Sequence, residues 1–247
     1  MRWAWPVADH LGSVTGTTMH IEFMGLPGSG KTTIARGVCA KLRASGYRLS
    51  LAPDGFVHAH PVALRAYKVA RIAVHGALHP SAALGAARRS RLFPQPSRSS
   101  AVRLLHNWLY VSAVLASRPR RGRLVVLDQG LCQGLYSLAL QSDGDQLRSV
   151  ERALAGGRRP DLVVSVEAPC EVARERMRSR ADSYSTIERL LLADERWLAK
   201  SMRILAGLRQ VLAEHDVQVL RCDSHGQTPA AAVDAITSGI AHRLSAG

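Results

Sequence analysis

Short runs of apolar residues, rich in Val, Ile and Leu, recur along the chain between longer amphipathic stretches. Such runs are typical of parallel strands that are buried on both faces. The expected strands are His20–Met24, Arg48–Ala52, Leu124–Asp128, Leu162–Val166 and Val217–Cys222. Strands that alternate with helices predict an α/β fold, with a five-stranded parallel sheet and helices on both faces.

Between these runs, apolar residues recur at the spacing of an amphipathic helix. The segment Phe93–Ser97 carries two prolines and is expected to break the region between residues 55 and 119 into two helical parts. The long stretch Ile187–His215 is expected to be interrupted near Ala206–Gly207, because glycine weakens a helix interior. The other expected helices are Thr32–Ser45, Ser99–Ser117, Gly134–Leu140, Gln146–Ala155, Cys170–Arg180 and Pro229–Leu244.

Residues 25–32 read G-L-P-G-S-G-K-T, directly after the first expected strand and before a helix. This is the phosphate-binding loop G-x-x-x-x-G-K-[ST] in its proper context. Its glycines let successive backbone N–H groups point at one anion, and the following helix adds its positive end. Lys31 would contact the β- and γ-phosphates, and the Thr32 hydroxyl would bind Mg²⁺. The residues expected to bind ATP here are Gly25, Leu26, Pro27, Gly28, Ser29, Gly30, Lys31, Thr32 and Thr33.

A second candidate is Asp128, which ends the apolar run Leu124–Leu127. An acidic residue at the end of such a strand commonly holds the metal of a phosphate-loop site. We therefore expect Thr32 and Asp128 to bind Mg²⁺ together. The alternative is that Asp128 caps the next helix.

Several segments together resemble the thymidylate kinase and deoxynucleoside kinase branch of the P-loop kinases. The phosphate-binding loop is specific, and four softer matches follow in the expected order. These matches are Asp128-Gln129-Gly130 with Gln133 and Tyr136-Ser137, residues 159–164, residues 168–180, and Leu220–Ser224 with Thr228-Pro229. The resemblance implies the P-loop nucleoside triphosphate hydrolase fold and an ATP-dependent kinase. It also implies a helical acceptor-binding insertion at about 55–122 and a lid at about 170–190.

The lid region places Arg176 and Arg180 four residues apart, on one helix face. A guanidinium can clamp a phosphate and can stack on adenine, so both arginines are assigned to ATP binding. The alternative is a basic surface helix whose arginines pair with Glu171, Glu175 or Glu188.

Asp54 follows the second expected strand, at the sheet edge where open α/β folds bind ligands. By resemblance it would accept the proton of the attacking hydroxyl, so Lys31, Asp128 and Asp54 are the expected catalytic residues. The alternative for Asp54 is a turn before Gly55. Two departures from the branch count against thymidylate as the acceptor: Gln129 replaces an arginine, and residues 52–55 lack the acceptor-binding arginine motif.

The formal net charge is +14, and much of it is regional. Residues 55–127 contain no Asp or Glu and twelve Arg or Lys. Such a surface would hold an anionic partner: a nucleotide-like or otherwise anionic acceptor, an anionic membrane surface through residues 55–123, or nucleic acid. The chain lacks the further motifs of a nucleic-acid motor, which disfavours that partner. A homodimer is compatible with the sequence, and so is a purely solvated basic face.

The four cysteines form no C-x-x-C pair, which argues against a zinc site and a disulfide framework. They favour a reducing, cytoplasmic location, with the basic region allowing peripheral contact with a membrane. No apolar run reaches the length of a membrane span. Residues 1–18 are expected to be a disordered tail, and residues 19–247 a P-loop kinase domain.

Two other functions fit the same loop. One is a sugar or antibiotic phosphotransferase built on this fold. The other is a P-loop nucleotide switch without kinase activity, although the sequence shows no residue placed to orient water.

Overall fold

The computed structural model describes residues 19–52, 61–116, 124–155, 159–179 and 186–246. Its centre is a parallel sheet of five strands in the order β2-β3-β1-β4-β5. The strands are β1 (Met19–Gly25), β2 (Leu49–Ala52), β3 (Leu124–Leu127), β4 (Leu162–Glu167) and β5 (Gln218–Asp223). The phosphate-binding loop therefore follows the middle strand of the sheet.

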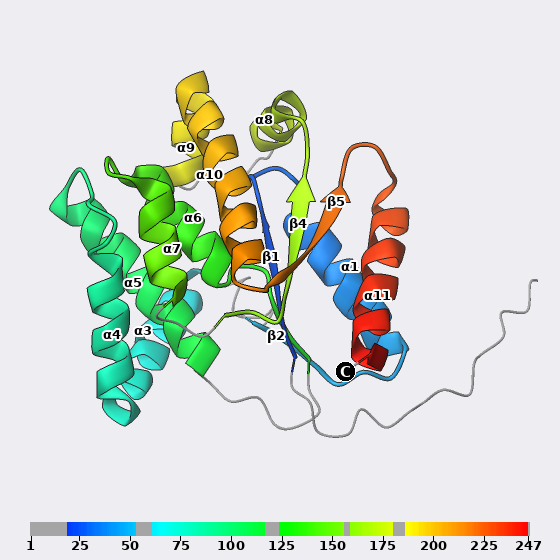
Figure 1. Ribbon diagram of the computed structural model, residues 1–247, viewed down its shortest axis with the longest axis horizontal. Coiled ribbons are helices and arrows are strands. Elements are labelled where there is room, and N and C mark those ends of the chain that lie inside the picture. The colour runs from blue at the N-terminus through cyan, green and yellow to red at the C-terminus, as the bar shows by residue number, and fades with distance from the viewer. Residues whose placement is uncertain (1–18, 53–60, 117–123, 156–158, 180–185, 247) are drawn as a thin grey trace, which may run out of the picture.

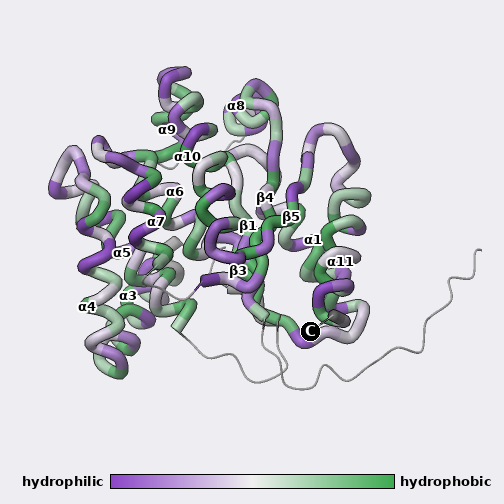
Figure 2. The backbone as a smooth tube through the Cα atoms, in the orientation of Figure 1, coloured by the Kyte–Doolittle hydropathy of each residue, from purple (hydrophilic) through white to green (hydrophobic). Residues whose placement is uncertain are grey.

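Helices cover both faces of the sheet (Figure 1), as the alternating pattern predicts. On one face lie α1 and α11, and on the other lie α6 and α10 with further helices outside them. In Figure 2, α4, α5 and α10 alternate between hydrophilic and hydrophobic residues along their length. The helices are α1 (Lys31–Ala44), α3 (Pro61–Leu78), α4 (Pro80–Ser90), α5 (Arg98–Ala116), α6 (Leu131–Gln141), α7 (Gln146–Ala155), α8 (Cys170–Arg178), α9 (Thr186–Ala193), α10 (Glu195–Glu214) and α11 (Pro229–Ala246).

Strand β1 is buried throughout, so its side chains pack alternately into two separate cores, one on each face of the sheet. Phe23 packs in the core beneath α1 and α11, with Val38 and Ile236. Met24 points to the opposite face, in the core that includes Leu135 of α6. The predicted parallel sheet between two helical layers is thus confirmed.

The expected interruption near Ala206–Gly207 is wrong. The break lies at Asp194, whose backbone is extended and whose carboxylate accepts the N–H of Arg196 at 2.8 Å, which starts α10. Helix α10 continues through Gly207 because this residue packs against α7. A Cβ at Gly207 would lie 2.3 Å from Leu147 Cδ2, so the glycine serves a close helix contact and not a break.

The described part of the insertion, residues 61–116, forms α3, α4 and α5. Pro80 begins α4 at its first position, so the expected first helical part is two helices. Helix α4 ends at Ser90, just before the buried Phe93 and the two prolines that predict a break here. The Trp108 indole N–H donates to the Ala86 carbonyl at 2.9 Å, which ties α5 to α4.

Residues 53–60 and 117–123, at the two ends of the insertion, lie outside the described residues, as does the expected tail 1–18. Among the described residues, no helix combines the length and the apolar character that a membrane crossing needs.

Candidate active site

The phosphate-binding loop curls tightly between β1 and α1. Gly28 and Gly30 both adopt left-handed backbone conformations, with φ of 82° and 88°. Gly28 also touches α8, since a Cβ there would lie 2.2 Å from the Ala173 carbonyl oxygen. The Ser29 N–H closes the turn on the Leu26 carbonyl at 3.1 Å. Only glycine meets both the backbone angle and the close approach at position 28.

Lys31 is the first residue of α1, and its side chain folds back over the loop. Its ammonium donates to the Gly25 carbonyl at 3.0 Å and to the Leu26 carbonyl at 2.8 Å. Backbone carbonyls are weaker partners for an ammonium than a phosphate is, because they carry only partial charge. The side chain is therefore held at the loop in a place from which it can turn to an anion.

Thr32 and Asp128 come together although 96 residues separate them in the sequence. The Thr32 hydroxyl donates to Asp128 Oδ2 at 2.8 Å. Asp128 is 8% exposed, and its Oδ1 has no hydrogen-bond partner within the described part of the chain. Asp128 does not cap α6, because the N-cap residue is Gly130. Thr32 and Asp128 therefore lie side by side, as the sequence predicts.

A buried carboxylate that the sequence analysis missed holds the start of α6. Glu22 of β1 is fully buried and accepts the N–H groups of Leu131 and Cys132, each at 2.8 Å. Burial raises the pKa of the Glu22 carboxyl, and the two backbone hydrogen bonds act to lower it. An acidic residue inside an otherwise apolar strand was the available signal. This contact fixes α6 three residues after Asp128.

Gln133, on the first turn of α6, reaches the loop itself. Its side-chain Oε1 accepts the N–H of Gly25 at 3.4 Å. The strand β1, the loop and α6 are thus joined by side-chain contacts, which orients the loop relative to Asp128.

Of the two arginines expected to bind ATP, Arg176 lies close to the loop. Its guanidinium donates to the hydroxyl and the carbonyl of Ser224, at 3.3 and 3.2 Å. A Cβ at Gly30 would lie 3.8 Å from Arg176 Nη1. Arg174, on the same helix, points elsewhere and pairs with Glu195 at 3.1 Å. Arg180 lies outside the described residues.

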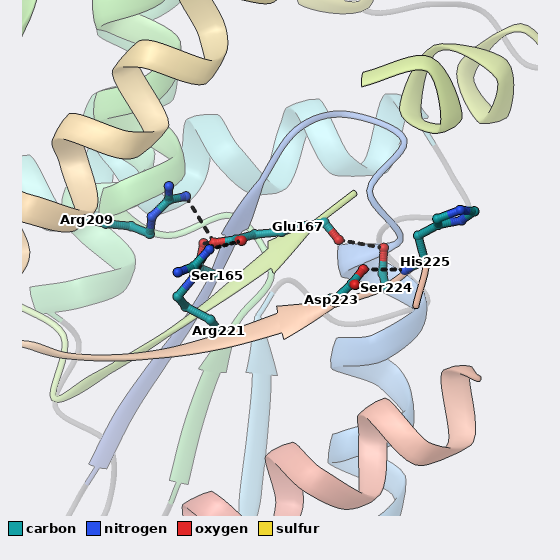
Figure 3. Close-up of polar contacts among 7 residues, drawn as sticks. All are labelled: Ser165, Glu167, Arg209, Arg221, Asp223, Ser224 and His225. Atoms are coloured by element: carbon teal, nitrogen blue, oxygen red, sulfur yellow. Dashed lines mark hydrogen bonds and ion pairs between the residues drawn. The ribbon is translucent and has the colours of Figure 1, made fainter. Parts of the chain in front are cut away.

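The loop after β5 is held by a polar cluster that the sequence analysis also missed (Figure 3). Glu167 of β4 pairs with Arg221 at 2.7 Å and with Arg209 at 3.1 Å. Its backbone carbonyl accepts the Ser224 N–H at 2.8 Å. Asp223 accepts the His225 N–H at 2.8 Å and so tightens the turn. Burial acts to raise the pKa of Glu167, but the Arg221 and Arg209 contacts hold it below its usual value. The cluster fixes Ser224, the partner of Arg176.

Asp54, the third expected catalytic residue, lies outside the described residues. The described site consists of the loop, Lys31, Thr32, Asp128 and the neighbouring Arg176.

Known proteins resemble the chain in fold and in family. A deoxyadenosine kinase from M. mycoides with bound dATP matches 90% of this chain and 99% of its own, with a TM-score of 0.52 and 16% sequence identity. The structure of the deoxyadenosine kinase from M. mycoides with bound dCTP gives a TM-score of 0.45 at 15% identity, over 91% and 100% of the two chains. No curated protein matches the chain.

At such identities, the first of these likenesses shows the fold alone, and it confirms the predicted P-loop kinase fold. The family evidence is independent of it. A family model described as an AAA domain matches residues 21–200, which is well over half of the 247 residues. The chain therefore belongs to the AAA domain family.

Proposed function

We propose that the protein is an ATP-dependent kinase that uses Mg²⁺ and phosphorylates a small anionic acceptor. The observation that carries the proposal is the contact of Thr32 Oγ1 with Asp128 Oδ2 at 2.8 Å, beside a loop that holds Lys31. In P-loop enzymes these three groups surround the β- and γ-phosphates and their metal ion. The kinase fold of the M. mycoides deoxyadenosine kinase supports the same assignment.

The loop would bind the phosphates through its backbone N–H groups and the positive end of α1. Lys31 would exchange the carbonyls of Gly25 and Leu26 for phosphate oxygens. Arg176 lies beside Gly30 and would stabilise charge on the transferred group or contact the adenine. These groups act by position and charge, so the transfer needs no covalent enzyme intermediate.

The residues present fit a divalent cation. Asp128 Oδ1 is buried without a partner in the described part of the chain, which is costly for a carboxylate oxygen unless a cation faces it. Thr32 and Asp128 offer the hard oxygen ligands that Mg²⁺ prefers. When bound, the ion would neutralise charge on the phosphates.

In the transfer itself, the acceptor oxygen bonds to the γ-phosphorus as the bond to the bridging oxygen of ADP breaks. The hydroxyl proton passes to a carboxylate, for which Asp128 and Asp54 are the candidates.

The acceptor would bind in the helical insertion. A cavity of about 290 Å³ lies between α3, α4 and α5 and reaches the first residue of α6. Leu131 in its wall is three residues from Asp128, so their Cα atoms are at most ~11 Å apart. No acidic residue lines it, and its polar lining includes basic groups, which favours an anionic acceptor. The lining includes His75, Ser81, Arg89, Trp108, Ser112 and Leu131.

The test is an acceptor screen by ADP release, with a metabolite library that contains nucleosides, nucleoside monophosphates, sugars and sugar phosphates. The acceptor found is then used to compare Lys31→Ala with Lys41→Ala. Lys41 lies on the same helix but pairs with Asp234, away from the loop, so it controls for loss of a lysine.

We expect Lys31→Ala to keep its melting temperature and lose about 10²–10³-fold in kcat, because one charge at the transferring phosphate is removed. Lys41→Ala should retain full activity. Normal transfer by Lys31→Ala would refute the proposal. ADP release that needs no acceptor would instead identify a nucleotide switch or hydrolase.

A further inference from the structure

Helix α3 turns an apolar face to solvent. Along α3, the exposed residues are almost all aliphatic, with Arg65 among them. Val62 is 80% exposed, Val69 57%, Val74 58% and Leu78 68%. Alanines at 66, 70, 73 and 77 complete this face. We call these residues the outer face of α3.

The opposite side of α3 is partly buried and combines polar residues with Tyr67 and Ile72, which pack against the core. Lys68, Arg71 and His75 recur at helical spacing, three and four residues apart, and none of them is fully exposed. The Lys68 ammonium lies 3.3 Å from the Asn107 side-chain oxygen and 5.1 Å from the centre of the Tyr110 ring, both on α5. Burial lowers the pKa of Lys68. A surface helix normally keeps its large aliphatic residues inside, whereas α3 leaves Val69, Val74 and Leu78 exposed.

The exposed apolar residues are concentrated in this part of the molecule. Large hydrophobic side chains that are exposed among the described residues fall mostly on α3, α4 and α5: Val62, Val69, Val74, Leu78, Leu84 and Val102, against Leu147 and Met202 elsewhere. The same described segment, residues 61–116, has eight basic residues and no acidic one. The basic residues are Arg65, Lys68, Arg71, Arg88, Arg89, Arg91, Arg98 and Arg103.

We propose that the outer face of α3 docks on an anionic lipid surface, with α3 lying in the plane of the membrane interface. An interfacial helix of this kind buries an apolar face in the headgroup region while nearby cations attract anionic lipids. Each basic residue near such a surface contributes about a fivefold gain in binding, which corresponds to ~1 kcal/mol. This docking is independent of the phosphate-binding loop.

Charge and area favour lipid over a second copy of the chain. Two copies joined through α3 would bring two acid-free basic segments together, which is repulsive. Helix α3 has 18 residues. It is therefore about 27 Å long and offers a face of roughly 300 Å², at a width of ~10 Å. A stable dimer needs ~800 Å² on each partner. Binding to a membrane has no such threshold, because its strength scales with the buried apolar area and is supplemented by attraction to anionic lipids.

The test is sedimentation of the full chain with vesicles of phosphatidylcholine, with or without phosphatidylglycerol. Binding is compared for wild type, Val69→Asp, the double variant Val69→Asp with Val74→Asp, and Arg65→Gln. Met202→Asp is the matched control, because Met202 is also an exposed large side chain but lies on α10. Melting temperature and ATP affinity report whether each variant is folded.

We expect wild type to bind the phosphatidylglycerol vesicles and not pure phosphatidylcholine. Each aspartate on the outer face should reduce binding on the order of tenfold or more, since it places a charge in the apolar contact. Arg65→Gln should weaken binding about fivefold. Met202→Asp should bind as wild type. Binding should fall between about 0.1 M and about 1 M salt, as the Debye length shrinks from ~10 to ~3 Å.

Three results would overturn the proposal. One is absence of vesicle binding at low salt by the folded wild type. Another is unchanged binding by the folded double variant. The third is a stable dimer in light scattering that Val69→Asp dissociates, without vesicle binding. Tight binding to nucleic acid without vesicle binding would likewise assign the outer face of α3 to another partner. Loss of vesicle binding with normal ATP affinity separates this proposal from the kinase proposal.

Discussion

Removal of the Glu22 carboxylate tests how the sheet edge that carries the phosphate-binding loop is held together. In the wild type this side chain is fully buried on β1 and accepts the N–H groups of Leu131 and Cys132 at 2.8 Å each. Replacing it in Glu22→Ala leaves both N–H groups at the start of α6 without their acceptor. Because they are buried, water cannot freely replace the carboxylate.

The magnitude follows from these two contacts. A hydrogen bond to a charged group contributes about 1.5–3 kcal/mol net, which would give about 3–6 kcal/mol for the pair. Burial of the carboxylate, which also raises the pKa of Glu22, offsets part of this gain. We therefore expect Glu22→Ala to lower the free energy of unfolding by about 2–4 kcal/mol.

Urea unfolding at pH 7 measures this loss. Asp194→Ala provides the comparison, because Asp194 is also an acidic acceptor at a helix start but its contact is exposed. Its expected cost is about 1 kcal/mol. A loss in Glu22→Ala no larger than that of Asp194→Ala would refute the reasoning and show that α6 keeps its start without Glu22.

The contribution of Glu22 to stability should depend on pH in one direction. Folding raises the pKa of Glu22 above its ordinary value of 4.5, mainly through burial, so folding favours the protonated acid. The stability that this shift contributes is full below pH 4.5 and is lost as pH rises through the folded pKa. We therefore expect the stability of wild type relative to Glu22→Gln to decline over that interval. A relative stability that rises with pH would mean that the two hydrogen bonds outweigh burial.

Two further predictions concern the phosphate-binding loop and the neighbouring Arg176. Gly30→Ala should cost about 1–2 kcal/mol in urea unfolding from its left-handed backbone alone. Gly28→Ala should cost more and weaken ATP binding, because its Cβ would also meet the Ala173 carbonyl oxygen at 2.2 Å; equal losses would refute this difference. Arg176→Met should raise the KM for ATP or lower kcat while leaving the melting temperature nearly unchanged, because its contacts with Ser224 are only partly buried; unaltered kinetics would remove it from the site.

Local sequence determined the parts of the site that depend on neighbouring residues. The loop was predictable because strand, glycines, Lys31 and helix follow one another in the chain. Asp128 was predictable because parallel strands end at one sheet edge, so a residue just after β3 lies near the loop after β1. The Thr32–Asp128 contact follows from these two facts together.

Contacts between distant segments were not predictable in the same way. Glu22 reads as an acidic residue in a strand, and only the position of α6 above it reveals its partners. Gly207 reads as a helix break by propensity, but packing against Leu147 explains it instead. Arg176 was found from its helix face, while its partner Ser224 comes from a loop 48 residues later.

Helix α3 shows a further limit of prediction from sequence: it has both an apolar and a polar stripe, and the sequence alone does not show which of them is buried. The usual rule would bury the valines and expose Lys68 and His75. The fold does the opposite, and His75 then lines the cavity between α3, α4 and α5. If α3 separates an acceptor cavity from a lipid surface, its polar side serves the reaction and its apolar side serves docking. The acceptor screen should therefore include anionic amphipathic acceptors presented in phosphatidylglycerol vesicles. A kinase that acts equally well on soluble acceptors, with no gain from vesicles, would show that the two sides of α3 work independently.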